Sequence, residues 1–542
     1  MDKKIEKLVE HAERLFKAHD IMLPLWQKQA QLFYPQRADF TSDKQPSQEF
    51  IEGLATSATI MIARELKQLM PSMLRPRGVD WFKWGIEGLK HNEIPIALQR
   101  YMQAAERFTL QKCYQQGTNF IRACEQTDGD YLFIGNGVTS CEVNYRTMRL
   151  LFRNWHPRDV TWSIDFDGSI AEVHRRGEMT LAALDAEFDG NLSEQAKKKL
   201  EKDRTQMVKY CHAVIKPEHY QGKREYSTPY VSVHYEKETG HVLREAGSHT
   251  LIYAIVQWER LSHVPFAYSP AVIAGLPDGR LIQEMTSDML DAGQMAIAPP
   301  LAAVEDAIMG ELNYVPRGIS MIDRDYDQKT GSPIQPIVTD RSALPYGFEF
   351  HDRIYSQLRS AFYLDTIQLP PPTPGMTLGE FQLSLPHYIR GASPFFENAE
   401  DGYTAPLMEL VFKTIDGVGG FENAPPELRE MDIQFTFDSP ITQAKEEAEA
   451  QKTVNGMKVM ADLAQFYPRT ARLIKEEEAG RGILSGMGTD PDYIKTEQES
   501  QQEAKAEQRQ QQMMQEMATI QQGANVAEDV GAAMRAMQEG AA

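Results

Sequence analysis

Cysteine is scarce in this chain, which has only four in 542 residues. They are Cys113, Cys124, Cys141 and Cys211. No two of them have the CxxC spacing of a zinc ribbon or a redox motif, and they are too few to form a disulfide framework. We therefore expect a protein of a reducing compartment such as the cytosol.

Long apolar runs are also absent. No uninterrupted stretch approaches the ~18 residues that a membrane-spanning helix needs. The first twenty residues, MDKKIEKLVEHAERLFKAHD, are charged and amphipathic and lack the apolar centre of a signal peptide. We expect a protein that is made and kept in solution, with no membrane partner.

The chain has fewer basic than acidic residues: 57 Lys and Arg against 77 Asp and Glu, which gives a formal net charge of −20. A protein that grips nucleic acid over a broad surface neutralises phosphates with basic side chains, so this balance argues against that class. Transient passage of DNA stays compatible with it. Acidity that only maintains solubility is an equally simple interpretation.

Nucleotide-binding and catalytic motifs are missing as well. The chain has no GxxxxGK[ST] phosphate loop, no GxSxG nucleophile turn and no HExxH helix. The short GNG at 135–137 indicates a turn rather than a dinucleotide site. We predict a protein that is not an enzyme and uses no cofactor.

Two patterns allow a metal site. Asp165 and Asp167, in SIDFDGS, could hold Mg²⁺ as nuclease carboxylates do, although a hairpin turn explains an Asp- and Gly-rich stretch better. A metal-dependent nuclease that uses these two residues is therefore the enzyme alternative. Zinc ligands are also available near Cys211, but their spacing matches no standard pattern: His212, His219, His234, His241 and His249.

Hydrophobic periodicity predicts an α+β fold of roughly three or four packed units. Residues 1 to about 125 have helical spacing, including a helix over 55–70 that ends at Pro71. Residues 126–265 alternate with period two and predict strands, with hairpins near Asn154 and Asp167-Gly168 and a short helix over 179–189. Trp81, Phe82 and Trp84 lack a basic cluster around them, so we interpret them as packing residues rather than a nucleic-acid stacking platform.

Two helices with a stiff loop after them dominate the next part. The first, over 277–297, has an apolar face that includes Ile282 and Leu290, and closes at Pro299-Pro300. A turn-rich piece over 299–348 leads to the second helix. The loop TIQLPPPTPGMT (366–377) follows, and Thr377 with Glu380 predicts a capping box for the next helix.

The remaining chain is again mostly helical. EMDIQFTFDSPI (430–441) predicts one strand, and the residues after it a helix. From about 495 the sequence is rich in Gln, Glu, Ala and Met and indicates low-complexity helix or disorder. That end allows a third alternative, a helical scaffold or adaptor protein, although it lacks sustained heptads.

This order of elements resembles the portal, or head-to-tail connector, proteins of tailed phages, specifically the short-tailed podovirus type. Four segments are similar to recurring segments of that family, and the resemblance covers nearly the whole chain. They are NWHPRDV (154–160), AEVHRRGEMT (171–180), VPFAYSPAVIAGLPDGRLIQEM (264–285) and IAPPL (297–301). Their order is the specific part.

The resemblance implies a portal fold assembled as a ring, normally a dodecamer, around a central channel. Carried over by position, it implies a wing at 1–265, a first stem helix at 266–297, a clip at 298–349 and a second stem helix at 350–365. It further implies a channel loop at 366–377, a wing helix and strand at 378–440, a crown at 441–494 and a Gln-rich C-terminal extension at 495–542.

The resemblance also implies roles for particular residues. The channel loop comprises Gln368, Leu369, Pro370, Pro371, Pro372, Thr373, Pro374, Gly375 and Met376. The acidic stripe Glu284, Asp288 and Asp291 fits a channel wall that repels phosphate, or a solvated outer face. Clip contacts to neighbouring subunits or partners would come from Tyr314, Arg317, Asp323, Arg324 and Asp325, which an ordinary surface turn explains equally well.

The implied function is passage of double-stranded DNA through one capsid vertex during packaging and ejection. The implied partners are further copies of the chain, the DNA in transit, the large subunit of the terminase motor, tail adaptor or nozzle proteins, and the major capsid and scaffolding proteins. The implied location is the virion, after synthesis and assembly in the host cytoplasm. Proline fixes φ and lacks an N–H donor, so PPPTPG suits a stiff, neutral finger in the channel, or alternatively a surface linker between helices.

Overall fold

The computed structural model describes residues 3–42, 53–86, 88–89, 94–220, 227–297, 301–303, 334–336, 344–368, 378–421, 423–429, 433–437 and 452–460, and scattered other positions from 442 to 514. The chain divides into two compact units. The first comprises 1–81, 109–420 and 439–441, and the second 82–108, 421–438 and 442–542. The described residues are α+β, as predicted.

Helices make up much of the first unit. They are α1 (Lys3–Asp20), α2 (Leu23–Phe33), α3 (Ala58–Leu74), α5 (Phe120–Gly129), α6 (Leu181–Glu187), α7 (Glu194–Lys202), α8 (Leu276–Ile297), α9 (Leu344–Ala361), α10 (Leu364–Ile367), α11 (Leu378–Ala399) and α12 (Ala405–Asp416). Three π-helical turns adjoin them, at η3 (Asp130–Ile134), η5 (Ala271–Gly275) and η7 (Glu400–Thr404). Two 3₁₀ turns are η1 (Pro35–Arg37) and η4 (Pro157–Asp159).

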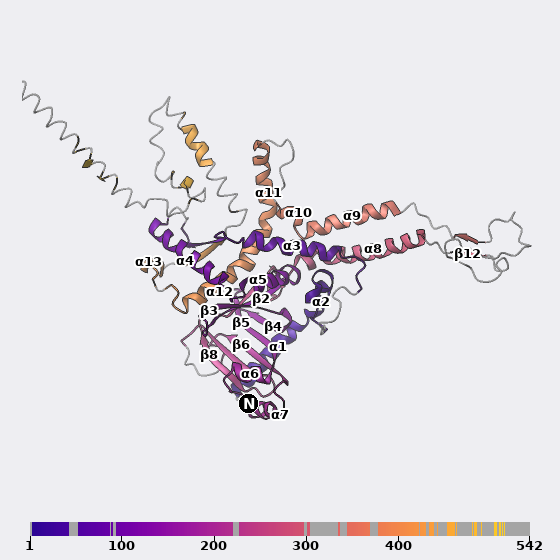
Figure 1. Ribbon diagram of the computed structural model, residues 1–542, viewed down its shortest axis with the longest axis horizontal. Coiled ribbons are helices and arrows are strands. Elements are labelled where there is room, and N and C mark those ends of the chain that lie inside the picture. The colour runs from indigo at the N-terminus through magenta and orange to yellow at the C-terminus, as the bar shows by residue number, and fades with distance from the viewer. Residues whose placement is uncertain are drawn as a thin grey trace, which may run out of the picture. The chain divides into compact units, whose positions relative to one another are not determined.

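Two antiparallel sheets form the β part of this unit (Figure 1). The larger has the order β4-β5-β6-β7-β8, with β4 (Val160–Ile164), β5 (Ile170–Thr180), β6 (Met207–Ile215), β7 (Tyr230–Glu236) and β8 (Val242–Ser248). The smaller has the order β3-β2-β9, with β3 (Arg149–Trp155), β2 (Asn136–Asn144) and β9 (Tyr253–Gln257). Two short pairs join β10 (Glu259–Arg260) to β11 (Ala267–Tyr268) and β12 (Leu301–Ala303) to β13 (Ile334–Pro336).

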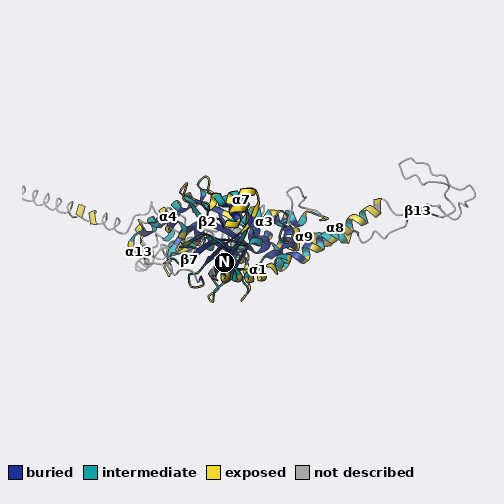
Figure 2. Ribbon diagram, turned by 90° about the horizontal axis from the view of Figure 1, so that it is seen from below, coloured by how far each residue is buried: buried dark blue, intermediate teal, exposed yellow. Residues whose placement is uncertain are grey.

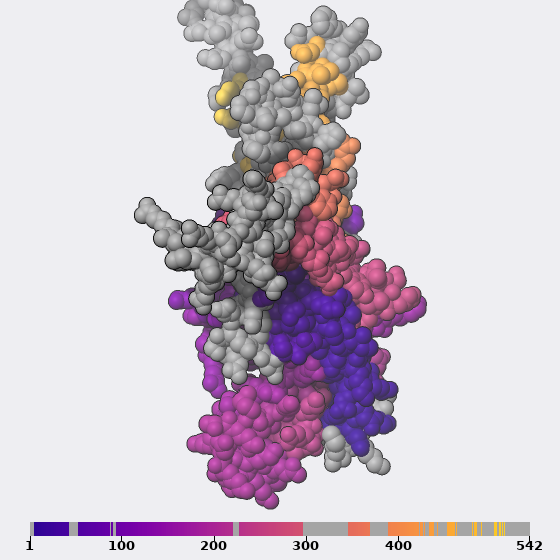
Figure 3. Space-filling model, turned by 90° about the vertical axis from the view of Figure 1, so that its right-hand side faces the viewer, coloured from indigo at the N-terminus to yellow at the C-terminus, as the bar shows by residue number. Residues whose placement is uncertain are grey.

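The larger sheet is covered by helices on both faces. Successive side chains of a strand point to opposite faces. Cys211 and Ala213 of β6 therefore pack with Ile5 and Leu8 of α1. Tyr210 of β6 packs on the other face, in a cluster with α6 and α7. Figure 3 shows the indigo N-terminal residues lying against the magenta residues of the sheet.

A buried ion pair joins α3 to the end of α5. Arg75 Nη2 lies 2.7 Å from both carboxylate oxygens of Asp128, and both side chains are almost completely buried. The guanidinium carbon of Arg75 also lies 5.0 Å from the ring centre of Tyr403. Burial alone would lower the pKa of Arg75, but the charge and hydrogen bonds of Asp128, together with smaller contributions from its other neighbours, raise that pKa well above its usual value.

A second buried carboxylate lies two residues further on. Asp130 accepts from Arg37 Nε at 2.9 Å and from Arg37 Nη2 at 2.7 Å, the two-point geometry that suits a guanidinium and a carboxylate. Asn154 of β3 completes the group, because its Nδ2 donates to Asp130 Oδ2 at 3.0 Å. The junction between α5 and η3 is thus tied to α3, η1 and β3.

Gly135 ends η3 and leads into β2. Its φ of +89° lies in the left-handed region, and a Cβ there would come within 2.7 Å of Ser269 N. Ser269 in turn is fully buried and donates its hydroxyl to Phe133 O at 2.9 Å. The turn predicted at GNG is therefore a close contact between η3 and the residues just before η5.

The second unit contains a two-stranded antiparallel sheet. β1 (Phe82–Ile86) pairs with β14 (Ile433–Phe437), so the predicted late strand exists and its partner comes from far earlier in the chain. Trp84 N donates to Glu106 Oε1 at 2.6 Å, and the Trp84 ring lies 5.1 Å from that of Phe421. Helix α13 (Pro426–Arg429) belongs to the same unit, and α4 (Ile96–Tyr114) continues from it into the first.

Three predicted boundaries are wrong. The helix over 55–70 does not end at Pro71 but continues to Leu74, because buried Met70 and Leu74 and a bond from Arg75 N to Pro71 O sustain the last turn. Asn154 is not at a hairpin turn. It lies in β3, where the partners of its amide are buried, and the β2–β3 turn is at 145–148.

The predicted helix over 350–365 begins earlier and is broken. α9 starts at Leu344, inside the range predicted for the clip, and ends at Ala361. Tyr363 has a left-handed φ of 60°, which separates α9 from α10, and α10 extends to Ile367 within the range predicted for the loop. α11 begins at Leu378, directly after the predicted cap Thr377.

Within the described ranges, none of the helices combines the length and apolarity needed to cross a membrane.

The Arg75–Asp128 pair gives a direct test of this core. Arg75→Met keeps the volume but leaves the Asp128 charge buried without its cation, so we expect the free energy of unfolding to fall by about 3–5 kcal/mol. The double variant Arg75→Met/Asp128→Leu should recover part of that loss. Urea denaturation measures both.

Lys413→Ala is the matched control, because it removes an exposed pair with Glu409 one helical turn away. Such pairs contribute about 0.3–0.5 kcal/mol. Equal effects of Arg75→Met and Lys413→Ala would contradict a structural role for the buried pair.

Candidate functional site

The predicted acidic stripe lies on one exposed face of α8. Glu284, Asp288 and Asp291 are spaced by four and three residues, which puts them on the same side of a helix, and all three are exposed. The helix itself is close to its predicted range of 277–297, since it begins one residue earlier. The structure therefore brings these three carboxylates together as a solvent-accessible stripe.

α8 and α9 run side by side, as Figures 1 and 2 both show. Ile282 of α8 and Ile354 and Leu358 of α9 are buried. Further out, Thr286 Oγ1 and His351 Nε2 lie 3.4 Å apart. The two helices thus form a pair packed along their facing sides.

The root of this pair is fixed to the N-terminal helices. Gln283 accepts from Thr56 N at 2.9 Å and donates to Thr56 O at 2.8 Å, immediately before α3. Arg359 of α9 donates to both carboxylate oxygens of Glu65 of α3, at 2.7 and 3.2 Å. Gly279 allows a close approach, because a Cβ there would lie 2.5 Å from Leu32 Cδ2.

The outer half of the pair is covered much less. Figure 2 shows exposed residues along the far end of α8. Leu290, predicted on the buried face, is 55% exposed, so the apolar face of α8 is not covered along its whole length. We call the following exposed residues of this end the outer apolar surface: Leu290, Met295, Ile297, Tyr346, Phe348 and Phe350.

Sequence reasoning missed the aromatic part of this surface. YGFEF (346–350) places aromatic residues at alternate positions. On a helix, each residue of such a series is rotated by about 200° from the one before it, so all three cannot lie on one buried stripe. This spacing could have indicated that some of these aromatic residues are exposed. Because the second helix is predicted to begin at 350, Tyr346 and Phe348 fall within the predicted turn-rich piece.

Most of the predicted loop and clip residues lie outside the described part of the chain. Gln368, directly after α10, is exposed, and residues 369–377 are not described. The five predicted clip residues, Tyr314, Arg317, Asp323, Arg324 and Asp325, fall within 304–333, which is also not described.

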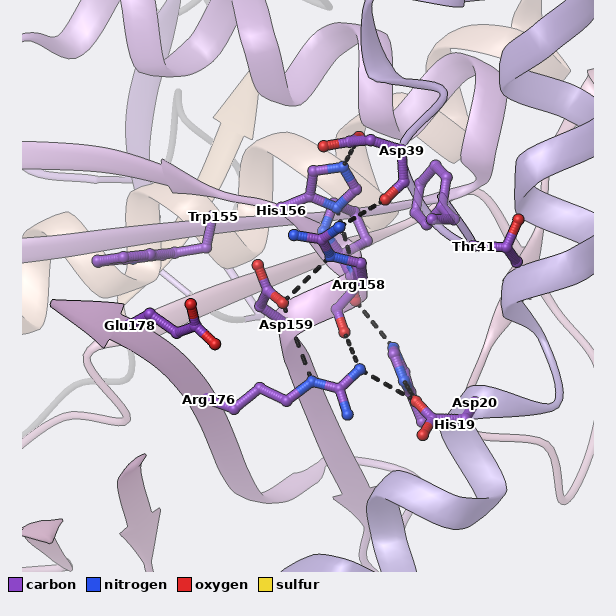
Figure 4. A network of polar contacts seen from close by, with 12 residues as sticks. His19, Asp20, Asp39, Thr41, Trp155, His156, Arg158, Asp159, Arg176 and Glu178 are labelled. Atoms are coloured by element: carbon purple, nitrogen blue, oxygen red, sulfur yellow. Dashed lines mark hydrogen bonds and ion pairs between the residues drawn. The ribbon is translucent and has the colours of Figure 1, made fainter. Parts of the chain in front are cut away.

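The segment 154–160 is held by a polar network (Figure 4). His156 Nδ1 accepts from Arg158 N at 3.0 Å, which leaves Nε2 to donate to Asp39 Oδ1 at 2.6 Å. Arg158 Nη1 donates to Asp39 O at 2.7 Å. Burial opposes ionisation of Asp39, but the hydrogen bond from His156 and the charges of His156, Arg158 and Arg37 together lower the pKa of that carboxyl.

Arg176 of β5 extends this network to α1. Its Nη2 donates to Asp20 Oδ1 at 3.1 Å and to Arg158 O at 3.0 Å. His19 Nε2 and Pro157 O lie 2.8 Å apart. The segments 154–160 and 171–180, singled out from the sequence, thus meet in a joint between α1, residues 39–41 and the larger sheet.

Asp165 and Asp167 form a turn rather than an open carboxylate pair. Asp165 pairs with Lys216 Nζ and accepts from Phe166 N at 2.8 Å. Asp167 accepts from Ser169 N at 2.9 Å and from Ser169 Oγ at 2.7 Å. Hydrogen bonds from Lys216 and Ser169 lower the pKa of the respective carboxyls, and the turn interpretation is confirmed.

The histidines near Cys211 do not gather around it. The rings of His212 and His234 are stacked with centres 3.8 Å apart, and His212 also contacts Tyr253 Oη at 2.6 Å and Ser232 Oγ at 2.8 Å. Burial lowers the pKa of His234 to about 3. Across the described residues, these histidines and Cys211 form no group of converging metal ligands.

Trp81, Phe82 and Trp84 are all buried, which confirms them as packing residues. A nucleic-acid stacking platform needs exposed ring faces. The described aromatic residues of this segment do not offer them.

The sequence of the chain was compared with known protein families. Residues 3–494 match the family described as bacteriophage head to tail connecting protein, so the match includes α8, α9 and the network of Figure 4. No curated protein matches the chain. The family consists of structural phage proteins rather than enzymes, and a connector between head and tail is a component of the virion. The chain therefore belongs to the bacteriophage head to tail connecting proteins.

Proposed function

We propose that this connector is the portal of a short-tailed phage, a closed ring of identical chains around a channel for double-stranded DNA. One observation carries the proposal. In a chain of the connector family, the outer half of the α8–α9 pair exposes six large apolar residues. Large apolar side chains exposed together on more than one side of a helix pair indicate contacts with neighbouring chains, and a heterologous contact repeated by rotation closes a ring.

The proposed parts follow the chain. α8 and α9 form the stem, the residues between them form the clip, and 366–377 form the channel loop. Residues 1–265 and 378–440 form the wing, and 441–494 form the crown, followed by the Gln-rich extension. Residues 82–108 and the strand 433–437 share the second compact unit, so the proposed wing contains parts of both units.

The proposed mechanism is passive. The chain lacks a phosphate-binding loop, so the energy for packaging comes from another protein, the terminase motor, which docks on the clip. After packaging, tail adaptor or nozzle proteins take over this rim. The wing meets the major capsid and scaffolding proteins at one capsid vertex, and the number of chains is twelve.

Ring formation is tested by placing charge on the outer apolar surface. Leu290→Asp/Phe348→Asp should prevent the ring from forming, because each buried side chain of this size contributes about 1.5–3 kcal/mol at every interface. Sedimentation velocity measures the mass of the purified chain. Both positions are exposed in the single chain, so its circular dichroism should not change.

Phe166→Asp is the matched control, because Phe166 is a fully exposed aromatic residue at a hairpin turn far along the chain from α8. It should leave the mass unchanged. A double variant that sediments like the unaltered protein would contradict a role for this surface in assembly.

The exposed acidic stripe is proposed as part of the channel wall. Carboxylates facing DNA repel its phosphates, so the duplex slides without being held. Salt screens this repulsion, and the screening length is about 8–10 Å near physiological ionic strength. A wall of this kind acts on the rate of DNA movement and leaves the ring intact.

Glu284→Gln/Asp288→Asn/Asp291→Asn should slow DNA movement in a packaging assay with proheads that carry this chain, most clearly at low salt. A control triple variant removes exposed carboxylates of the larger-sheet region: Glu187→Gln/Glu194→Gln/Glu238→Gln. Equal rates for the stripe variant and the unaltered protein, at both packaging and ejection, would end the channel-wall proposal.

The proline loop is proposed as a stiff finger that contacts DNA sterically. Its prolines restrict φ, and it carries no Lys or Arg that would trap a phosphate. We expect replacement of Pro370, Pro371, Pro372 and Pro374 by glycine to lower the fraction of DNA retained in filled heads, because flexible loops no longer obstruct backward slippage.

Thr373→Ser keeps all four prolines and serves as the control for this loop. Retention is measured by nuclease protection of the packaged DNA. Full retention by the glycine variant would favour the alternative, a surface linker between helices.

A further inference from the structure

Three potential metal ligands converge between α1 and β5. They are His11 of α1 and Glu172 and His174 of β5, and their ligand atoms all lie within 4.8 Å of one another. His11 Nε2 lies 2.6 Å from Glu172 Oε1, and His174 Nε2 lies 3.3 Å from Glu172 Oε2. Glu172 and His174 are two residues apart on one strand, so their side chains share a face of the sheet, the face that α1 covers.

The carboxylate is held ready by its surroundings. Ser163 Oγ, on the neighbouring strand β4, donates to Glu172 Oε1 at 2.8 Å. The Ser163 hydroxyl therefore orients the Glu172 carboxylate, as outer partners orient metal ligands.

One histidine has a ring nitrogen without a hydrogen-bond partner among the described atoms, and the other is partly exposed to solvent. His174 is buried, and its Nδ1 has no hydrogen-bond partner among the described atoms. Buried polar atoms without a partner are rare and call for an explanation, of which a bound ion is one. The side chain of His11 is 40% exposed, so an ion and a water ligand have access to the group from one side.

We propose that His11, Glu172 and His174 form a binding site for a divalent transition metal ion, with Zn²⁺ the best match, that fixes α1 to the larger sheet. Two imidazoles and one carboxylate are a ligand set that zinc accepts, with water in the fourth position. All four cysteines are buried elsewhere, so thiolate does not complete the site. Imidazole ligands favour zinc and its neighbours over Mg²⁺ or Ca²⁺.

The geometry requires only a small adjustment. Zinc bonds of about 2.0–2.2 Å hold adjacent ligand atoms about 3–3.5 Å apart. His11 and Glu172 must therefore separate by less than about 1 Å. His11 is the half-exposed member of the group, so the adjustment falls on its ring rather than on the two buried strand residues.

The test uses the untagged full chain, stripped with EDTA and titrated with Co²⁺ alone. We expect one Co²⁺ per chain with visible absorption bands of a low-coordinate ion, displacement of those bands by Zn²⁺, and a rise in Tm with Zn²⁺. His11→Ala should weaken binding by at least about tenfold and remove the Zn²⁺-dependent rise. Because His11 is half-exposed, this variant is expected to fold.

His241→Ala is the matched control, since His241 is partly exposed, its Nε2 lies 3.3 Å from Asn191 Oδ1, and it does not belong to the converging group. It should bind Co²⁺ as the unaltered chain does. Glu172→Gln, which removes the anionic ligand, should also abolish the absorption bands. Absence of bands in the unaltered chain, or equal binding by His11→Ala, would overturn the proposal.

Discussion

The first unit depends on two buried aspartates separated by a single glycine. Asp128 holds Arg75 at the end of α3, and Asp130 holds Arg37 of η1 together with Asn154 of β3. Each charge is buried, so each is stable there only because its partner is present. Removing the first ion pair would weaken the contact between α3 and α5, and removing the second would weaken the contact of η1 with the end of α5.

This junction leads directly to the helix pair that we assign to the stem. Gly135 follows η3 and approaches Ser269, and Ser269 precedes η5 and α8. The root of α8 is therefore set by the same buried core that fixes α3 and β3. Its outer half has no such support within the described chain, and it carries exposed apolar and acidic residues on the same helix. A fixed root with an uncovered outer half is what a subunit needs when neighbouring copies complete its packing.

Periodicity predicted the elements of this fold better than their ends. α8 differs by one residue from its predicted start, and the turn at Asp167-Gly168 and the strand near 433–437 are present. The break at Tyr363 was not predictable, because tertiary packing imposes a left-handed conformation on a residue that normally avoids it. Helix α7 was also missed, since it is short and strongly charged.

Contacts between residues far apart in the chain could not be predicted from the sequence. Asn154 was assigned to a turn because asparagine favours turns, whereas its amide bonds to Asp130 inside the sheet. The sequence indicates possible zinc ligands among the histidines near Cys211, because several of them lie close together in the chain. The converging group instead joins His11 to a strand more than 150 residues later, a separation that spacing rules do not cover.

The central claim is that many copies of this chain enclose an open axis. Electron microscopy of the purified full-length protein tests it most directly, because end-on images reveal both the symmetry and the centre of an assembly. We predict rotationally symmetric annular particles with a hollow middle that admits duplex DNA. Isolated subunits over the whole accessible concentration range, or closed discs filled with protein, would contradict it.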